Sequence, residues 1–150
     1  MNGPPFFVKN ATIVLSQYGM WPEFHDAEVI WVELNRKGCT LSMQLKVFQM
    51  ANEVDEQGYY KRIKQNLVTF CFSGIEELML ADFNEQNSIF SLLLEKEDAR
   101  IKVTIEPSYG LRGIFYCREA EVTAVEPYLD RHGNPGTSLE TGDPSSDSGK

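Results

Sequence analysis

The run Thr40-Leu-Ser-Met-Gln-Leu-Lys-Val-Phe48 decides the fold class of this chain. Successive side chains of a strand point to opposite faces, and here polar and apolar residues alternate without a break. The pattern therefore predicts a half-solvated strand whose core face carries Leu41, Met43, Leu45 and Val47 and whose solvent face carries Ser42, Gln44 and Lys46.

Further strands are predicted on both sides of this run. The preceding stretch, Ala27–Leu34, has apolar residues on both faces, as expected of a central strand, and Asn35–Gly38 then turns the chain. A polar loop follows at Asn52–Gly58. Later strands are predicted at Leu67–Ser73, Glu77–Ala81, Ser88–Glu95, Arg100–Glu106 and Gly113–Val125. Their expected inward residues are Val68, Phe70, Phe72, Phe90, Leu92, Leu94, Ile101, Val103 and Ile105.

One segment, Asn10–Tyr18, has helical character. Asn10 is a candidate cap at its start, and Gly19 stands where a helix would end. The fold class is therefore predicted to be mainly β (α+β). We expect about seven strands in meander order, forming an antiparallel sheet or flattened barrel, with one N-terminal helix.

Composition divides the 150 residues into two parts. Residues 1–129 are predicted to form a single β-rich domain, long enough to bury a core without disulfides or a metal. Residues 130–150 are rich in Gly, Ser, Pro and Asp, and Leu139 is their only large apolar residue. Such a segment buries too little surface to offset the entropy of ordering it, so a disordered tail is predicted.

The charge of the chain restricts its partners. The net charge is -8, and because residues 130–150 hold four acids and two bases, -6 belongs to residues 1–129. Nucleic acids and anionic membrane surfaces are bound through clustered Lys and Arg, so neither is expected as a partner. An acidic surface instead suits a basic partner.

The cysteines and the apolar runs indicate a cellular setting. Cys39, Cys71 and Cys117 are odd in number and far apart, which argues against a disulfide framework and against a zinc ribbon. The first residues lack the basic and apolar regions of a secretion signal. The most apolar stretch, Ile89–Leu94, is much shorter than the roughly 20 residues of a membrane-spanning helix. We therefore expect a cytoplasmic protein.

The catalytic content of the sequence is low. It contains no phosphate-binding loop, dinucleotide fingerprint or nucleophile elbow, so a non-enzyme without cofactor or metal is predicted. One dense polar run, Trp21-Pro-Glu-Phe-His-Asp-Ala-Glu28, leaves two interpretations open. If the chain turns there, His25, Asp26 and Glu28 can form a divalent-metal or acid/base site. Alternatively, His25 and Asp26 bond the backbone of the turn and Glu28 meets a cation on a neighbouring strand.

Other polar features have structural or interface interpretations. The amides of Phe83-Asn-Glu-Gln-Asn87 suit a turn or the recognition of a partner. The basic run Lys61–Lys64 is typical of a solvated edge, and the glycines of Tyr109–Gly113 indicate a turn or bulge. Tyr59, Tyr60, Tyr109 and Tyr116 fit either an interface patch or packing on the sheet.

These motifs together resemble the bacterial immunity protein 50 family. The resemblance rests on Trp21-Pro22 with Phe24–Val29, on Phe83–Asn87, on Tyr109–Cys117 and on Val122–Pro127, and it covers residues 10–128. It implies a cytoplasmic, non-catalytic protein that binds and neutralises a cognate toxin of a polymorphic or contact-dependent system. The residues that carry the motifs, as partner contacts or as structural groups, are Trp21, His25, Asp26, Glu28, Asn84, Gln86 and Asn87. The alternative function is a metal-dependent hydrolase or small-ligand-binding protein that uses His25, Asp26 and Glu28.

Overall fold

The structure is a computed structural model, and it describes residues 5–54, 57–58, 60–129 and 138–139. Within these residues, one helix, α1 (Ala11–Tyr18), accompanies a ten-stranded mixed sheet. The strands are β1 (Val8–Lys9), β2 (Glu28–Asn35), β3 (Thr40–Val54), β4 (Tyr60–Ser73), β5 (Glu76–Ala81), β6 (Ser88–Glu97), β7 (Arg100–Tyr109), β8 (Arg112–Cys117), β9 (Glu119–Pro127) and β10 (Ser138–Leu139). The mainly β class with an N-terminal helix is thus confirmed.

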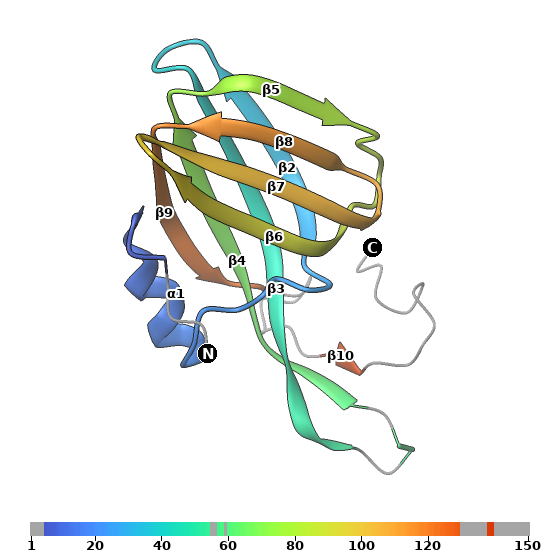
Figure 1. Ribbon diagram of the computed structural model, residues 1–150. Helices are drawn as coiled ribbons and strands as arrows, with labels where there is room; N and C mark the ends of the chain where they lie inside the picture. Colours follow the sequence, from blue (N-terminus) through green and yellow to red (C-terminus); the bar gives the residue numbers. More distant parts are fainter. Residues whose placement is uncertain (1–4, 55–56, 59, 130–137, 140–150) are drawn as a thin grey trace.

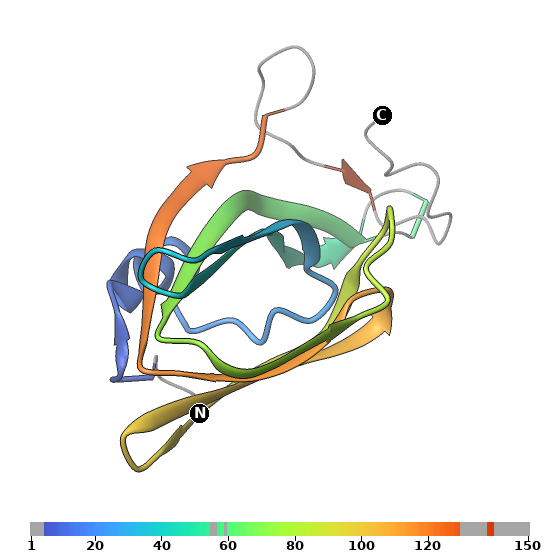
Figure 2. The ribbon, with the colours of Figure 1, turned by 90° about the horizontal axis from the view of Figure 1, so that it is seen from above.

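The sheet has the order β1-β9-β4-β3-β2-β6-β7-β8-β5, and β10 pairs with β4. All pairs are antiparallel except β1 with β9. The predicted meander order is wrong, because β2 pairs with β6 and β9 pairs with β4. In Figure 1, β5–β8 cross in front of β2–β4, and Figure 2 shows the sheet curling around the interior. The two end strands, β1 and β5, are not paired with each other in the part of the chain that is described.

The sheet forms two layers, with β5–β8 in front and β2–β4 behind (Figure 1). They are joined through Gly113–Val125, for which the sequence predicted one long strand. That stretch is divided at Arg118 into β8, which pairs with β5 and β7, and β9, which pairs with β4. The backbone N–H of Arg118 donates to Ser73 O at 2.8 Å, which fixes the corner. A period-two pattern continues through such a corner, so the change of layer leaves no trace in the pattern of residues.

The core confirms most of the predicted inward residues. Leu41, Met43, Leu45 and Val47 are all buried, as are the predicted inward residues of β4 and β7. Aromatic rings connect the layers: Phe70 and Phe72 stack at 5.7 Å, and Phe72 meets Phe115 of β8 at 5.3 Å, edge to face. Aromatic contacts of this kind add stability beyond the area they bury.

Bulges overturn two further predictions. The register of β6 shifts between Ile89 and Ser91, so Ile89 is buried and Phe90, predicted inward, is 56% exposed. The register of β2 shifts between Val29 and Trp31. Among the described residues β2 pairs with β6 only at Glu28. Beyond Glu28 it therefore pairs on one side only, with β3, and is not the central strand that was predicted. A bulge adds one residue and so reverses the faces of everything beyond it.

Helix α1 lies beside β9 (Figure 1). Asn10 stands at its start with φ 62°, but its side chain donates to Glu121 Oε2 at 3.0 Å rather than capping the helix. Gly19 ends the helix with φ 76° and donates its N–H to Leu15 O. Buried Tyr18 donates its hydroxyl to Val47 O, and burial raises the pKa of Tyr18. No helix in the described chain has the length and apolar character needed to cross a bilayer.

The predicted loop at Asn52–Gly58 is shorter than expected, because β3 runs to Val54. The hairpin of β3 and β4 extends beyond the rest of the sheet (Figure 1). Of the predicted tail, Ser138–Leu139 form β10 opposite Arg62 and Lys61, and residues 130–137 and 140–150 lie outside the described part of the chain.

Candidate functional site

The segment from Trp21 to Glu28 connects α1 to β2 through a tight turn. Phe24 and Asp26 have left-handed backbone conformations, with φ of 61° and 68°, and the N–H of Ala27 donates to Phe24 O at 3.0 Å. Left-handed backbone is unfavourable for residues with a Cβ and persists only where the surroundings impose it. The turn is held by β6, because the N–H of Asp26 donates to Ile89 O and the N–H of Ile89 donates to Ala27 O, both at 2.8 Å.

The turn separates its side chains into two sets. Trp21 and Phe24 are 9% and 2% exposed, and both meet Phe70 edge to face, at 6.3 and 5.7 Å. His25 and Asp26 point the other way, and the side chain of each is 54% exposed. The Trp-Pro motif therefore anchors the turn in the core, while the His-Asp pair lies at the surface.

His25 contacts both the turn and β6. Its Nδ1 lies 3.1 Å from Phe90 O, and because a carbonyl oxygen only accepts, Nδ1 carries the proton of this hydrogen bond. Its ring meets the ring of Phe90 edge to face at 5.3 Å, and its Nε2 lies 3.7 Å from Asp26 Oδ2. His25 thus fastens the turn to β6 and leaves Nε2 and the carboxylate beside it at the surface.

Glu28 lies apart from this pair on β2, where its register partner is Lys46. No group of three His, Cys, Asp or Glu side chains suited to a metal ion exists among the residues that the structure describes. The chain does turn between His25 and Glu28, as the metal interpretation requires, but the turn does not gather a ligand set. The other interpretation is matched only in part: His25 bonds a backbone carbonyl, but on β6 rather than in the turn, and a cationic residue, Lys46, lies in register opposite Glu28.

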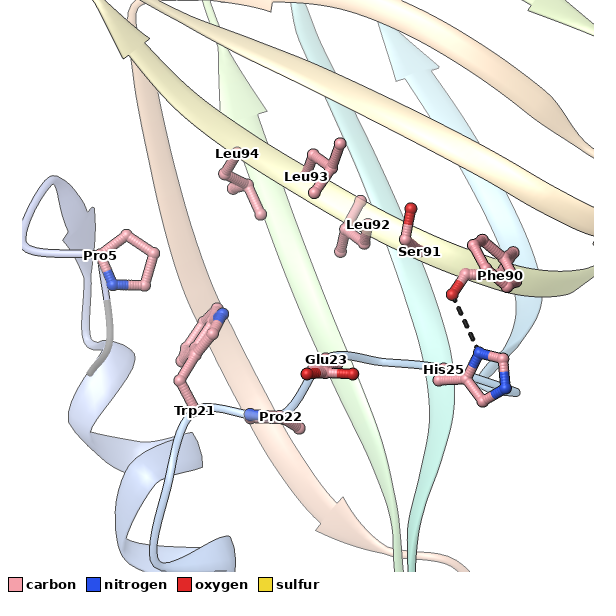
Figure 3. Close-up of a pocket in the computed structure, with 10 residues that line it drawn as sticks. All are labelled: Pro5, Trp21, Pro22, Glu23, His25, Phe90, Ser91, Leu92, Leu93 and Leu94. Carbon is pink, nitrogen blue, oxygen red and sulfur yellow. Dashed lines mark hydrogen bonds between the residues drawn. The ribbon is translucent and has the colours of Figure 1, made fainter. Parts of the chain in front are cut away.

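A groove of about 670 Å³ opens between this turn and β6 (Figure 3). The linker supplies Trp21, Pro22, Glu23 and His25 to one wall, and Pro5 lies at one end. Residues Phe90–Leu94 of β6 form the other wall. Phe90 and Leu93 are 56% and 42% exposed, so the groove has apolar side chains within reach of solvent.

The second polar motif, Phe83–Asn87, meets the turn at the junction of β2 and β6. Asn87 is 3% exposed, and its Oδ1 accepts from the N–H groups of Asn84 and Leu111, at 2.9 and 3.0 Å. Its Nδ2 donates to Asn84 O, and its own carbonyl accepts from the N–H of Val29. Asn87 therefore joins three segments: its side chain bonds the loop before β6 and the loop between β7 and β8, and its backbone carbonyl bonds β2.

Gly110 completes this junction. It has φ 86°, and a Cβ at this position would lie 2.5 Å from Gln86 O and 2.6 Å from Asn87 Oδ1. Only glycine fits such a close approach. The Tyr109–Gly113 motif and the Phe83–Asn87 motif are thus two sides of one contact. Asn84 and Gln86 are exposed, and Asn84 Oδ1 accepts from the N–H of Glu85.

A smaller groove, of about 330 Å³, lies where β2 and β5 face each other. Val32 and Leu34 of β2 line it together with Leu80, Ala81, Asp82, Phe83 and Leu111. Leu34 and Phe83 are each 57% exposed. Its one charged lining residue, Asp82, is engaged by Arg112 at 3.4 Å.

The remaining predicted features are dispersed. Arg100 lies over the ring of Tyr116, 3.8 Å from its centroid, and Tyr109 is 54% exposed on a different strand. Tyr60 and the run Lys61–Lys64 belong to β4, and Tyr59 lies outside the described residues. Tyr109 and Tyr116 therefore lie on different strands, and neither lines the larger groove.

An ion cluster lies at the corner between β8 and β9. Glu76 accepts from Arg100 at 2.9 Å and from Arg118 at 3.3 Å, and these bonds hold the pKa of its carboxyl below the usual value.

Near this corner, burial raises the pKa of Cys117 to about 12, so its thiol stays protonated at neutral pH.

Sequence reasoning missed the β6 wall of the groove, including Ser91 and Leu93. A signal was present in Ile89-Phe-Ser-Leu-Leu-Leu94, which is apolar at every position except Ser91. In a strand that is not covered on both faces, such a run must expose part of its apolar surface.

Comparison with known proteins adds the family. A search of functionally described proteins gives no match. Among solved structures, a crystal structure of an uncharacterized protein from Neisseria gonorrhoeae is similar at 15% identity, covering 67% of this chain and 93% of that one, with a TM-score of 0.44. The profile of a family described as immunity protein 50 matches residues 10–128, which include the turn, both walls of the groove and the Asn87 junction. This chain belongs to the immunity protein 50 family.

Proposed function

We propose that this protein neutralises a cognate bacterial toxin by binding to it, without catalysis, in the cytoplasm of the cell that produces both. Family membership over residues 10–128 is the observation that carries the proposal. Binding by a rigid protein needs a complementary surface and no reacting groups. The exposed walls of the groove beside His25 provide such a surface, and the aromatic packing of Trp21 and Phe24 gives it a fixed base.

The charge supports a basic toxin as the partner. Residues 1–129 carry -6, and the protein as a whole carries -8. Opposite charges accelerate the encounter of two proteins, and salt screens this effect over a Debye length of about 10 Å at 0.1 M. The association rate with a basic toxin should therefore fall about tenfold or more between 20 and 300 mM NaCl, while the dissociation rate changes less.

The test is co-expression with a candidate toxin module taken from the reading frames that neighbour this gene. Cells that carry the toxin alone should stop growing, and cells that also carry this protein should grow normally. A catalytically inactive toxin variant should form a complex that elutes as one species in size exclusion. Growth arrest in the presence of the protein, with separate elution of the two chains, would refute the proposal.

A further inference from the structure

Strand β6 has an open edge in the wall of the larger groove. It pairs with β7 along its length, from Ser88 to Glu97, but with β2 only through Ser88 and Glu28. Among the described residues no strand pairs with β6 on this side beyond Ser88. The unpaired N–H and C=O groups of an edge strand are a template for another extended chain.

The turn between β6 and β7 sets which amides face the opening. Glu97 and Arg100 flank a two-residue turn, and the pair that closes such a hairpin exchanges hydrogen bonds. Bonded and non-bonded pairs then alternate along an antiparallel ladder. Leu92, Leu94 and Lys96 belong to the non-bonded pairs, so their N–H and C=O groups point toward the open side.

The groove runs alongside the open edge of β6. The linker from Trp21 to His25 runs along the opposite side from Phe90–Leu94, with Pro5 at one end and His25 at the other (Figure 3). A strand lies about 4.8 Å from its neighbour in a sheet. Beyond the β2 junction, Ile89 O accepts from the N–H of Asp26 and Phe90 O accepts from His25, so pairing with a partner would begin after Phe90.

The surroundings of the groove are acidic. The two segments that form and flank its walls, residues 21–28 and 88–98, hold six acids and one base: Glu23, Asp26, Glu28, Glu95, Glu97, Asp98 and Lys96. The adjacent strand β7 adds Arg100, Lys102 and Glu106, and Lys46 of β3 lies in register opposite Glu28. Arg100 is already engaged by Glu76 and Glu77, at 2.9 and 3.1 Å. This balance favours a segment that carries Lys or Arg.

We propose that the groove between β6 and the Trp21–His25 linker binds an extended, basic segment of the toxin, which pairs as an additional strand with the open edge of β6. The inference rests on the proposed function and assigns it a surface. Main-chain pairing supplies affinity in such complexes, and the side chains beside the edge supply specificity. Here those side chains are Glu23, Phe90 and Leu93.

The role of charge in the groove is tested with two charge-reversal substitutions, each of which replaces a glutamate with a lysine. Glu23→Lys changes a groove residue, whereas Glu33→Lys changes an exposed residue of β2 outside the groove. With the inactive toxin module as probe, Glu23→Lys should weaken binding about tenfold at 50 mM NaCl, and Glu33→Lys less than threefold. Equal effects of the two reversals would overturn the assignment of the groove.

The apolar wall and the strand pairing have separate tests. Leu93→Asp should weaken binding at least tenfold, whereas Leu78→Asp on β5, at a residue of similar exposure, should not. Hydrogen exchange of the complex should show new protection at the amides of Leu92, Leu94 and Lys96. Protection of other strands without these amides would refute strand pairing.

The outcomes separate this inference from the function on which it rests. If the wild-type protein fails to bind or neutralise the toxin, both are refuted. If it binds, and Leu93→Asp and Glu23→Lys behave like their controls, the function stands and the groove is not its surface. A dimer of the free protein that Leu93→Asp dissociates would assign the groove to a second copy and overturn the proposal.

Discussion

At the junction of β2 and β6, the segment Phe83–Asn87 turns an amide inward, whereas the segment Trp21–Glu28 turns an imidazole and a carboxylate outward. Asn87 is 3% exposed and its side chain makes three hydrogen bonds, while the side chains of His25 and Asp26 are each 54% exposed. Both segments match the same family. The comparison indicates that Phe83–Asn87 serves the fold, whereas Trp21–Glu28 serves the fold through Trp21 and Phe24 and presents a surface through His25 and Asp26.

The largest effect is expected from the inward side of the turn. Phe24→Ala removes a ring that is 2% exposed and contacts Trp21 and Phe70, so it should lower the free energy of unfolding by about 4 kcal/mol. Phe90→Ala, at a 56% exposed ring, should cost less than about 1 kcal/mol. Urea denaturation of both variants measures the contrast, and equal losses would contradict it.

Asn87→Ala should come next, at about 3 kcal/mol, because it leaves the N–H groups of Asn84 and Leu111 without their acceptor. The matched control is Asn84→Ala, whose exposed side chain accepts only from the N–H of Glu85 in the described structure. We expect the control to cost less than about 1 kcal/mol in the same urea titration. A small loss for Asn87→Ala would mean that water or a neighbouring group replaces the amide.

Gly110→Ala tests the close approach behind Asn87. The new Cβ would meet Gln86 O at 2.5 Å in a left-handed backbone, and we expect a loss of about 2 to 3 kcal/mol. Gly19→Ala provides the control, because Gly19 also has a positive φ but has nothing within 4 Å of its Cβ position. Thermal unfolding of both should show the larger decrease in Tm for Gly110→Ala; the reverse order would contradict the contact.

On the outward side, His25→Ala should cost only about 0.5 to 1 kcal/mol, the net value of one exposed hydrogen bond. It should nevertheless weaken toxin binding, because the turn that forms one wall of the groove loses its bond to Phe90 O. Chemical denaturation and a binding titration on the same sample check both expectations. A loss above about 2 kcal/mol would show that His25 belongs with Asn87 among the fold-building residues.

The smallest effect is expected at Glu76, in the ion cluster far from both segments. Its pKa is lowered in the folded protein by Arg100 and Arg118, so its stabilising contribution is present above the ordinary value of 4.5 and is lost as pH falls through the folded pKa. Glu76→Gln should therefore be slightly less stable than wild type at pH 7, and the difference should vanish on acidification. A difference that persists at low pH would point to a cause other than charge.

Much of the fold followed from residue periodicity, because one buried face leaves a clear trace in the sequence. Leu41, Met43, Leu45 and Val47 are inward as predicted, and Gly19 ends the helix as predicted. The bulges beside Ile30 and Phe90 were missed, since an inserted residue is determined by tertiary pairing rather than by local pattern. The corner at Arg118 was missed for the same reason.

The candidate site was only partly predictable. The run from Trp21 to Glu28 was visible as a dense polar motif, but a sequence does not say which of its side chains enter the core. That division depends on the left-handed conformations of Phe24 and Asp26, which β6 imposes through Ile89. The opposite wall of the groove depends on pairing between β6 and β7, so it required the structure.

The corner at Arg118 has a consequence for how the protein unfolds. Since β8 passes directly into β9, one uninterrupted stretch of backbone belongs to both layers. Neither layer can detach as an autonomous folding unit without pulling strands out of the other. We therefore expect a single cooperative transition, in which Cys117, buried beside the corner, becomes reactive toward a thiol reagent only when the whole domain opens.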